Sequence, residues 1–292
     1  MKVGVIGLGA MGEHLARNLY LASYLHSVWN RTESKAARVA QELGVIHADS
    51  AAALAKSVDV ILTCVSQDED LDEVIAACTP ALSAGKIIVD TSTVSPVTAR
   101  RHAEQLAEKD VVFLDAPVSG GVEGAKNRSL AVMVGGDEEA LVRVRPVLEA
   151  VAGHVEYIGP SGSGQACKMV NQVMVAGINQ AVTEALAFGS ALKLPMDKVM
   201  AVLGQGAAAN WFLKRRGATM LAGTFNSGFK IKLHYKDLAI CKSVAAQLGA
   251  HLTIVEMTLV HYKRLIDAGH GDEEISALYR LKKQLFEDPA SY

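Results

Sequence analysis

The chain has 292 residues, of which half are hydrophobic and 21% are charged, and its formal net charge is −2. This length suits two domains, and the composition is typical of a globular protein. The basic residues form no stripe, which argues against nucleic acid as a partner. With no signal-peptide pattern and no apolar run long enough for a bilayer, we expect a cytoplasmic protein without a membrane partner.

The four cysteines are widely separated and form no CxxC pair. They are Cys64, Cys78, Cys167 and Cys241. This usage predicts reduced thiols, and the sequence offers no set of metal ligands.

Strands and helices alternate in the first half of the chain. Short β-branched runs predict strands at residues 3–6, 27–29, 58–64, 86–90, 111–114, 129–134 and 154–157. Amphipathic segments predict helices at 11–24, 33–43, 68–78, 96–109 and 137–151. This alternation is typical of a parallel sheet covered by helices on both faces.

The pattern changes after the Gly-Pro-Ser-Gly-Ser-Gly segment at 159–164. A long helix is predicted at 165–192, and the later helices are expected at 196–204, 210–220, 232–248, 254–268 and 274–286. We therefore divide the chain into an α/β domain, residues 1–162, and an all-α domain, residues 163–292.

Three glycines lie between the first predicted strand and the helix that follows it. The segment reads Gly7-Leu8-Gly9-Ala10-Met11-Gly12, which is the Gly-x-Gly-x-x-Gly fingerprint of dinucleotide binding in its usual context. The first glycine permits a tight turn, the second lets a pyrophosphate approach the backbone, and the third lets the helix pack on the strand. The N–H groups at the helix N-terminus would face the phosphates. This predicts a Rossmann-type first domain.

The end of the next strand indicates which dinucleotide is bound. A carboxylate there would hold the ribose 2′-hydroxyl and favour NAD, but the sequence reads Asn30-Arg31-Thr32. Asn30 and Thr32 can donate hydrogen bonds, and Arg31 can pair with a 2′-phosphate. We expect a preference for NADP, with NAD as the alternative cofactor. The competing interpretation is that Arg31 is a solvated surface residue.

A second glycine-rich turn follows the strand predicted at 111–114. Ser119, Gly120 and Gly121 can present a hydroxyl and successive backbone N–H groups to an anion such as a carboxylate. An ordinary tight turn would have the same composition, so the residues alone leave both interpretations open.

The long predicted helix carries a lysine and two amides on one face. Asn171 and Gln172 follow Lys168 at positions i+3 and i+4. A lysine at such a place can protonate a carbonyl oxygen as hydride arrives at carbon, or remove a hydroxyl proton in the reverse direction. A surface lysine is the more common interpretation of a lysine on a helix.

Four ordered motifs together resemble the β-hydroxyacid dehydrogenase family, which includes 3-hydroxyisobutyrate dehydrogenase, tartronate semialdehyde reductase and glyoxylate/succinic semialdehyde reductase, and more distantly 6-phosphogluconate dehydrogenase. The motifs are residues 7–12, 115–121, 162–171 and 229–238, so the resemblance covers nearly the whole chain. Two positions depart from the family pattern. Gln172 stands where many members have Asn, and Glu274 stands where many have Asp.

The resemblance implies a role for each matching residue. Lys168 would be the catalytic acid/base, Ser119, Gly120 and Gly121 would bind the substrate carboxylate, and Asn171 would orient the substrate or the lysine. The resemblance also implies contacts with the nicotinamide half of the cofactor for Val65, Ser66, Thr93 and Lys236. Asp237 would be structural and would hold Lys236.

Two aromatic residues follow Asn210. Trp211, and Phe212 after it, could project toward the active site and limit the size of the substrate, or could instead pack in a helical core. We place Trp211 and Gln172 among the substrate-binding residues. His234 is expected to be structural.

We therefore expect an enzyme that transfers hydride between NADP(H) and a small 3-hydroxy acid or its semialdehyde, in a cleft between the two domains. Glyoxylate and succinic semialdehyde are plausible substrates, and methylmalonate and tartronate semialdehydes remain open. The alternatives are an imine reductase, against which Lys168 argues, and a non-catalytic NADP-binding assembly protein. The family resemblance implies a homodimer or homotetramer.

Overall fold

The computed structural model describes residues 1–226 and 228–287. The chain forms two compact units, Met1–Lys168 and Met169–Tyr292. The division therefore falls within the long helix α8 (Ser163–Ala191), whereas the sequence pattern placed it just before that helix.

The first unit contains one mixed sheet and the helices that cover it. Its strands are β1 (Val3–Ile6), β2 (Leu25–Trp29), β3 (Ile46–His47), β4 (Val60–Thr63), β5 (Ile87–Asp90), β6 (Val112–Asp115), β7 (Val118–Ser119), β8 (Leu130–Gly135) and β9 (Ala152–Gly159). Its helices are α1 (Gly12–Leu21), α2 (Glu33–Leu43), α3 (Ala51–Ser57), α4 (Asp68–Cys78), α5 (Pro96–Ala107), α6 (Gly121–Lys126) and α7 (Glu138–Glu149), with a 3₁₀ turn, η1 (Thr79–Ala81).

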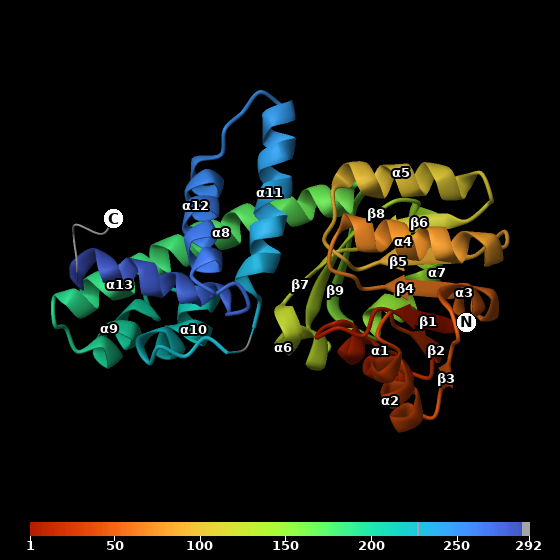
Figure 1. Cartoon of the computed structure of the whole chain (residues 1–292), viewed down its shortest axis with the longest axis horizontal. Helices are drawn as coiled ribbons and strands as arrows, with labels where there is room; N and C mark the ends of the chain where they lie inside the picture. The colour runs from red at the N-terminus through yellow and green to blue at the C-terminus, as the bar shows by residue number, and fades with distance from the viewer. Residues whose placement is uncertain (227, 288–292) are drawn as a thin grey trace. The chain divides into compact units, whose positions relative to one another are not determined.

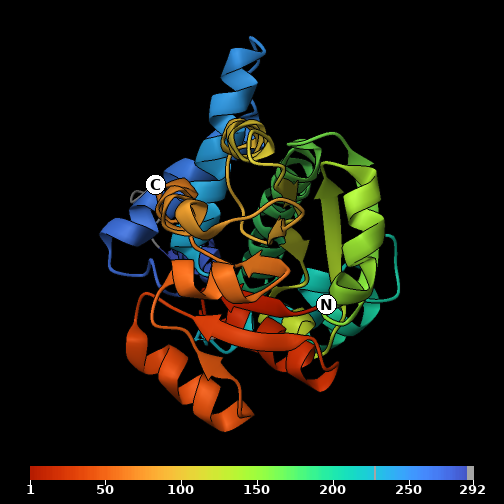
Figure 2. The same cartoon turned by 90° about the vertical axis from the view of Figure 1, so that its right-hand side faces the viewer.

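The central strands bury both faces, because consecutive apolar side chains point to opposite sides of a strand. Val60 and Leu62 of β4 join a core with α1, α2 and α7, whereas Ile61 joins a second core with α3, α4 and α5. The helices accordingly lie on both sides of the sheet (Figure 1). Figure 2 shows the sheet from a second direction, with α2 at its β2–β3 edge.

The strand order is β3-β2-β1-β4-β5-β6-β8-β7, and β9 also pairs with β8. The six strands from β3 to β6 are parallel, so their carboxyl ends meet at one edge of the sheet. Successive strands are added toward one side of the sheet from β1 to β3 and toward the other side from β4 to β6. Open α/β sheets bind ligands at such a switch point, which here lies between β1 and β4. The pairs β6–β8 and β7–β8 are antiparallel, so the predicted parallel sheet is extended by antiparallel pairs at one side.

The described part of the second unit is built from helices. The unit holds α8 from Met169 onward. Its other helices are α9 (Met196–Leu203), α10 (Trp211–Leu221), α11 (Ile231–Gln247), α12 (Thr253–Asp267), η2 (Ile275–Leu278) and α13 (Tyr279–Glu287). Helices α11 and α12 pack together, and their core includes Leu238 and Tyr262. The predicted combination of a Rossmann-type α/β unit with a helical unit is confirmed.

Candidate active site

The glycine-rich turn between β1 and α1 has the form that a dinucleotide requires. Gly7 has a φ of +93°, and a Cβ there would lie 2.3 Å from the carbonyl oxygen of Cys64. A Cβ on Gly12 would lie 1.9 Å from the carbonyl oxygen of Gly7, so only glycine lets α1 pack this closely. A Cβ on Gly9, by contrast, would meet no atom within 4 Å. The space beside Gly9 is therefore open to a ligand.

Helix α1 begins without a side-chain cap, because Met11 at its N-cap position makes no such hydrogen bond. The first N–H groups of a helix need an acceptor, and the positive end of the helix dipole favours an anion. The turn and the helix end together fit the pyrophosphate of a dinucleotide. Gly7, Leu8, Gly9, Ala10, Met11 and Gly12 all lie in this turn or at the start of α1, and their contact with the cofactor stays a prediction.

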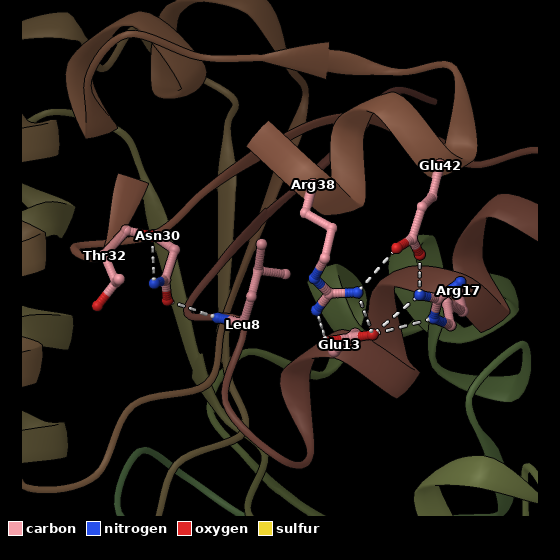
Figure 3. Close-up of polar contacts among 7 residues, drawn as sticks. All are labelled: Leu8, Glu13, Arg17, Asn30, Thr32, Arg38 and Glu42. Atoms are coloured by element: carbon pink, nitrogen blue, oxygen red, sulfur yellow. Dashed lines mark hydrogen bonds and ion pairs between the residues drawn. The ribbon is translucent and has the colours of Figure 1, made fainter. Parts of the chain in front are cut away.

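Asn30 joins the loop after β2 to the glycine-rich turn (Figure 3). Its side-chain oxygen accepts a hydrogen bond from the N–H of Leu8 at 2.9 Å, and its amide group donates to the carbonyl oxygen of Thr32 at 3.0 Å. The sequence interpretation treated Asn30 as a donor to the cofactor. In this structure its amide group is engaged within the protein, where it holds the two loops together.

Arg31 is exposed and reaches across to the first turns of α4. Its guanidinium lies 2.8 Å from a carboxylate oxygen of Asp70 and 3.6 Å from one of Glu73. Ion pairs this exposed contribute little to stability, so they leave the guanidinium available to a stronger anion. Arg31 and Thr32 flank the start of α2, at the same carboxyl edge as the glycine-rich turn.

A four-residue ion cluster connects α1 to α2, and the sequence analysis did not find it (Figure 3). Arg38 contacts Glu13 at 2.6 Å and Glu42 at 3.0 Å, and Arg17 contacts Glu13 at 2.9 Å and also pairs with Glu42. The hydrogen bond from Arg38 holds the pKa of Glu13 below its ordinary value. The i, i+4 spacing of Glu13 and Arg17 was visible in the sequence, but the contacts between the helices were not.

Asp90 connects the loops that follow β4 and β5. It is fully buried, and its Oδ1 accepts hydrogen bonds from the hydroxyls of Thr63 at 2.7 Å and Ser92 at 2.6 Å. The Ser92 hydroxyl also accepts from the backbone N–H of Val65 at 2.8 Å. Burial raises the pKa of Asp90 to about 6, so the carboxylate acceptor is present at neutral pH. Asp90 thereby fixes Val65 and the loop that carries Thr93.

Asp115, at the end of β6, holds the first turn of α8. Its two carboxylate oxygens accept from the backbone N–H groups of Gly162 at 2.8 Å and Gln165 at 2.9 Å. A Cβ on Gly164 would lie 2.5 Å from the Asp115 carbonyl oxygen, so this close approach requires glycine. The sequence identified Asp115 only as the first residue of a motif, and the structure assigns it the role of a helix cap.

Lys168 follows on α8 and is buried, with 7% of its surface exposed. Its ammonium group donates a hydrogen bond to the carbonyl oxygen of Val118 at 2.8 Å. Val118 directly precedes the Ser119-Gly120-Gly121 turn. The interpretation of Lys168 as a surface residue is therefore wrong, because the ammonium lies beside the predicted anion-binding turn.

The Ser119–Gly121 turn depends on its glycines. Gly120 has a φ of +130° and Gly121 a φ of +63°, and both values favour glycine. Ser119 belongs to the short strand β7 and is partly exposed. Ser66 is exposed in the loop after β4.

The helical unit holds a second group of predicted residues. Asn171 donates to the Gln172 side chain at 2.8 Å, and Gln172 donates to the carboxylate of Asp237. The same carboxylate is ion-paired with Lys236 at 2.9 Å, so Asp237 holds Lys236 as the family resemblance implied. His234 is fully buried, with its ring nitrogens 3.0 Å from the Tyr262 hydroxyl and 3.2 Å from the Gln172 carbonyl oxygen, which supports a structural role.

The two aromatic residues after Asn210 face different surroundings. Phe212 is buried in the helical core, so the packing interpretation holds for it and the expected projection into the site does not. Trp211 is 54% exposed and lines a groove of about 580 Å³ with Met200 and Lys214. Trp211 therefore lies at the surface of this groove and not in the helical core.

Neither a metal centre nor a membrane span emerges from residues 1–226 and 228–287. No group of three or more His, Cys, Asp or Glu side chains there is arranged to hold a metal ion. None of the helices in the same ranges combines the length and apolarity that a membrane crossing demands.

Comparison with known families adds independent support. Residues 2–159 match the family model described as the NAD binding domain of 6-phosphogluconate dehydrogenase. Residues 162–282 match the model described as NAD-binding of NADP-dependent 3-hydroxyisobutyrate dehydrogenase. The two matches adjoin at the start of α8 and cover nearly the whole chain.

Individual relatives agree with these models. The chain is 39% identical to the 2-hydroxy-3-oxopropionate reductase of Escherichia coli, over 86% of this chain and 87% of the relative. It is 32% identical to a Pseudomonas aeruginosa 3-hydroxyisobutyrate dehydrogenase, over 96% and 97% of the two chains. The solved structure of the Mycobacterium tuberculosis 3-hydroxyisobutyrate dehydrogenase with L-serine superposes with a TM-score of 0.86 at 29% identity, covering 96% and 98%.

The open glycine-rich turn, the uncapped end of α1 and both family models agree that the first unit binds a nicotinamide dinucleotide. The named relatives are dehydrogenases and reductases of hydroxy acids. The chain belongs to the β-hydroxyacid dehydrogenase family and is an oxidoreductase that acts on CH–OH groups.

Proposed function

We propose that this enzyme catalyses reversible hydride transfer between NADP(H) and a small 3-hydroxy acid or its semialdehyde, with Lys168 as the acid/base. The observation that carries this proposal is the buried ammonium of Lys168, which is bonded to Val118 immediately before the Ser119–Gly121 turn. A proton donor and an anion-binding turn in this proximity suit a substrate that bears both a carbonyl group and a carboxylate.

In this proposal the Ser119 hydroxyl and the backbone N–H groups of Gly120 and Gly121 bind the substrate carboxylate. The bound cofactor supplies or accepts the hydride at its nicotinamide ring. Lys168 gives a proton to the carbonyl oxygen as the new C–H bond forms, and the neutral amine takes the proton from the hydroxyl group in the reverse reaction. Asn171 and Gln172 orient the substrate, Lys236 and Thr93 contact the nicotinamide half, and Trp211 limits the size of the substrate.

The experiment that tests this proposal is cofactor oxidation followed at 340 nm. The panel consists of glyoxylate, succinic semialdehyde, methylmalonate semialdehyde and tartronate semialdehyde, each with NADPH and with NADH. Tartronate semialdehyde is 2-hydroxy-3-oxopropionate, the compound in the name of the Escherichia coli relative. Turnover of one compound well above the others would name the substrate class, and inactivity with all four would contradict the proposal.

Lys168→Ala should lower kcat by orders of magnitude, because it removes the proton donor. Binding of NADP⁺, measured by titration calorimetry, should change little, since the glycine-rich turn is intact. Lys126→Ala, in the turn of α6 after the carboxylate-binding segment, is the matched control and should keep activity near that of the wild type. Turnover of Lys168→Ala at the wild-type rate would exclude Lys168 as the acid/base.

The preference for NADP is proposed from Arg31, which the 2′-phosphate would draw from its exposed pairs with Asp70 and Glu73. A charge-assisted Arg–phosphate bond should change the affinity by roughly 10- to 100-fold. Arg31→Ala should weaken NADP⁺ binding by that factor and leave NAD⁺ binding nearly unchanged. Equal losses for the two cofactors, or none, would remove the 2′-phosphate argument.

We also propose a homodimer or homotetramer. In the helical unit, Val170, Met174 and Phe188 of α8 are each more than half exposed although they are apolar, with 63%, 61% and 52% of their surfaces exposed. Large exposed apolar side chains on one helix are typical of a protein interface. Light scattering should give a mass of two or four chains, and a monomer would contradict this expectation.

A further inference from the structure

One buried glutamine in the first unit has no part in the function proposed above. Gln165 is fully buried in the first turn of α8, three residues before Lys168. Its side-chain amide nitrogen donates to the carbonyl oxygen of Ser92 at 2.9 Å. Its side-chain oxygen accepts from the backbone N–H of Val94 at 3.2 Å. These two bonds span the residue between them, which is Thr93.

The backbone of Gln165 is held as firmly as its side chain. Its N–H donates to Asp115 at 2.9 Å, and Asp115 also holds Gly162 at 2.8 Å. On the other side, Ser92 is bonded to Asp90 and to the N–H of Val65. A continuous buried network therefore runs from the loop after β4, through the loop after β5, to the start of α8.

We propose that Gln165 is a positioning residue that locks the Ser92–Val94 loop to the helix turn that carries Lys168. This inference rests on the proposed function, in which Thr93 contacts the nicotinamide half and Lys168 is the acid/base. Hydride and proton transfer require donor and acceptor to be held in a narrow range of distances and angles. Gln165 fixes the relative place of the two protein segments that serve these two transfers.

The chemistry of the side chain explains why a glutamine is needed. The site offers one acceptor, the Ser92 carbonyl, and one donor, the Val94 N–H, and a primary amide matches both at once. Methionine has similar length but makes neither bond. Glutamate accepts from Val94 in its ionised form, but its second oxygen then faces the Ser92 carbonyl without a proton between them. Protonated glutamate again has one donor and one acceptor.

The test uses the full chain with Gln165→Met, Gln165→Glu and the control Gln105→Met, whose side chain is exposed on α5. The first readout is independent of turnover. Hydrogen exchange of residues 92–95 should become at least tenfold faster in Gln165→Met, while its Kd for NADP⁺ stays within about threefold of the wild type because the glycine-rich turn is untouched. Unchanged exchange in this loop would overturn the proposal.

The second readout is kinetic. In Gln165→Met, kcat should fall 10- to 100-fold with less than a threefold change in the substrate KM, and the isotope effect with 4-deuterated NADPH should increase because hydride transfer becomes slower. The control should match the wild type in both measurements. A kcat of Gln165→Met within threefold of the wild type would overturn the proposal. A loss of kcat that follows a lowered melting temperature in both Gln165→Met and Gln105→Met would overturn it as well.

The third readout is a pH-dependent rescue. The groups that face residue 165 are Asp115 at its backbone, Asp90 through Ser92, and Lys168 one turn along α8. The activity of Gln165→Glu relative to Gln165→Met, measured at the same pH, should rise severalfold as the pH falls from 8 to 5, since protonation restores the donor. A constant ratio would contradict the role of the amide donor.

If the wild type turns over none of the panel substrates, the proposed function fails, but the exchange readout still tests whether Gln165 locks the loop. If the wild type is active and Gln165→Met matches it, only the positioning role fails. The two failures are therefore distinguishable.

Discussion

Two buried polar networks, one in each unit of the protein, are built from different groups. In the α/β unit, the carboxylates Asp90 and Asp115 accept hydrogen bonds from the hydroxyl and N–H groups of neighbouring loops. In the helical unit, Asn179 donates to the Tyr262 hydroxyl, and the same hydroxyl meets His234. Loops at strand ends have N–H groups that need acceptors, whereas helices satisfy their own backbone and use polar side chains to fix how they pack.

Alanine substitutions in the glycine-rich turn should give the largest loss of stability. Gly12→Ala places a methyl group 1.9 Å from the Gly7 carbonyl oxygen and should destabilise the α/β unit by about 3 kcal/mol. Gly9→Ala meets no protein atom within 4 Å and should leave the melting temperature nearly unchanged. Its effect should be on NADP⁺ affinity instead, because the methyl group occupies the phosphate approach.

Calorimetric melting and NADP⁺ titration on the two alanine variants would separate these effects. If Gly9→Ala lowered the melting temperature as much as Gly12→Ala, the assignment of a packing role to Gly12 and a ligand-facing role to Gly9 would be wrong.

The side-chain network of the helical unit offers an intermediate effect. Tyr262→Phe removes the hydroxyl that accepts from Asn179 at 2.9 Å and lies 3.0 Å from His234, so a buried ring nitrogen loses its partner. The expected loss of stability is about 1–3 kcal/mol, measured by urea unfolding. Tyr20→Phe, at an exposed tyrosine of the first unit, is the matched control. A free energy of unfolding unchanged by Tyr262→Phe would show that this network does not stabilise the helical unit.

The pH dependence of stability offers the smallest effect and has opposite signs in the two units. Burial raises the pKa of Asp90 to about 6 from 3.8, so Asp90 binds its proton at a higher pH in the folded state than in the unfolded state. The contribution of Asp90 to stability is therefore lost as the pH rises from about 4 to 6. Burial lowers the pKa of His261 to about 4 from 6.5, so its contribution is lost as pH falls from 6.5 to 4.

Urea unfolding at pH 4.5 and pH 7 measures both contributions. The free energy of unfolding of Asp90→Asn, relative to the wild type, should be higher at pH 7 than at pH 4.5. That of His261→Gln should be higher at pH 4.5 than at pH 7. The same sign for both variants would contradict the assignment of the two pKa shifts.

The sequence pattern was most informative where a segment was long or strongly periodic. Helices α2 and α4 begin and end at the predicted residues, and β1 does as well. Strand β3 and helix α3 were missed because two residues and seven residues are too short to show a period. Helix α6 was missed because it has only six residues and begins at Gly121, the last glycine of a predicted turn.

The sequence placed several site residues through one general rule, that parallel strands end at the same edge. This rule brings the Gly7–Gly12 turn, Val65 and Thr93 to one side of the sheet, as observed. The bond from Gln165 to Ser92 and the bond from Gln172 to Asp237 join residues 73 and 65 positions apart. No local spacing encodes such pairs, and for the same reason the bond from the Leu8 N–H to Asn30 was not predicted.

The cap that Asp115 places on α8 has a consequence for how the chain acquires its structure. During synthesis from the N-terminus, every strand of the sheet is made before Gln165 exists. Until residue 165 emerges, Asp115 lacks the backbone donor that Gln165 provides, and the Val118 carbonyl lacks its bond to Lys168. The α/β unit therefore gains these two bonds only after the first two turns of the following helix have been made and pack against it.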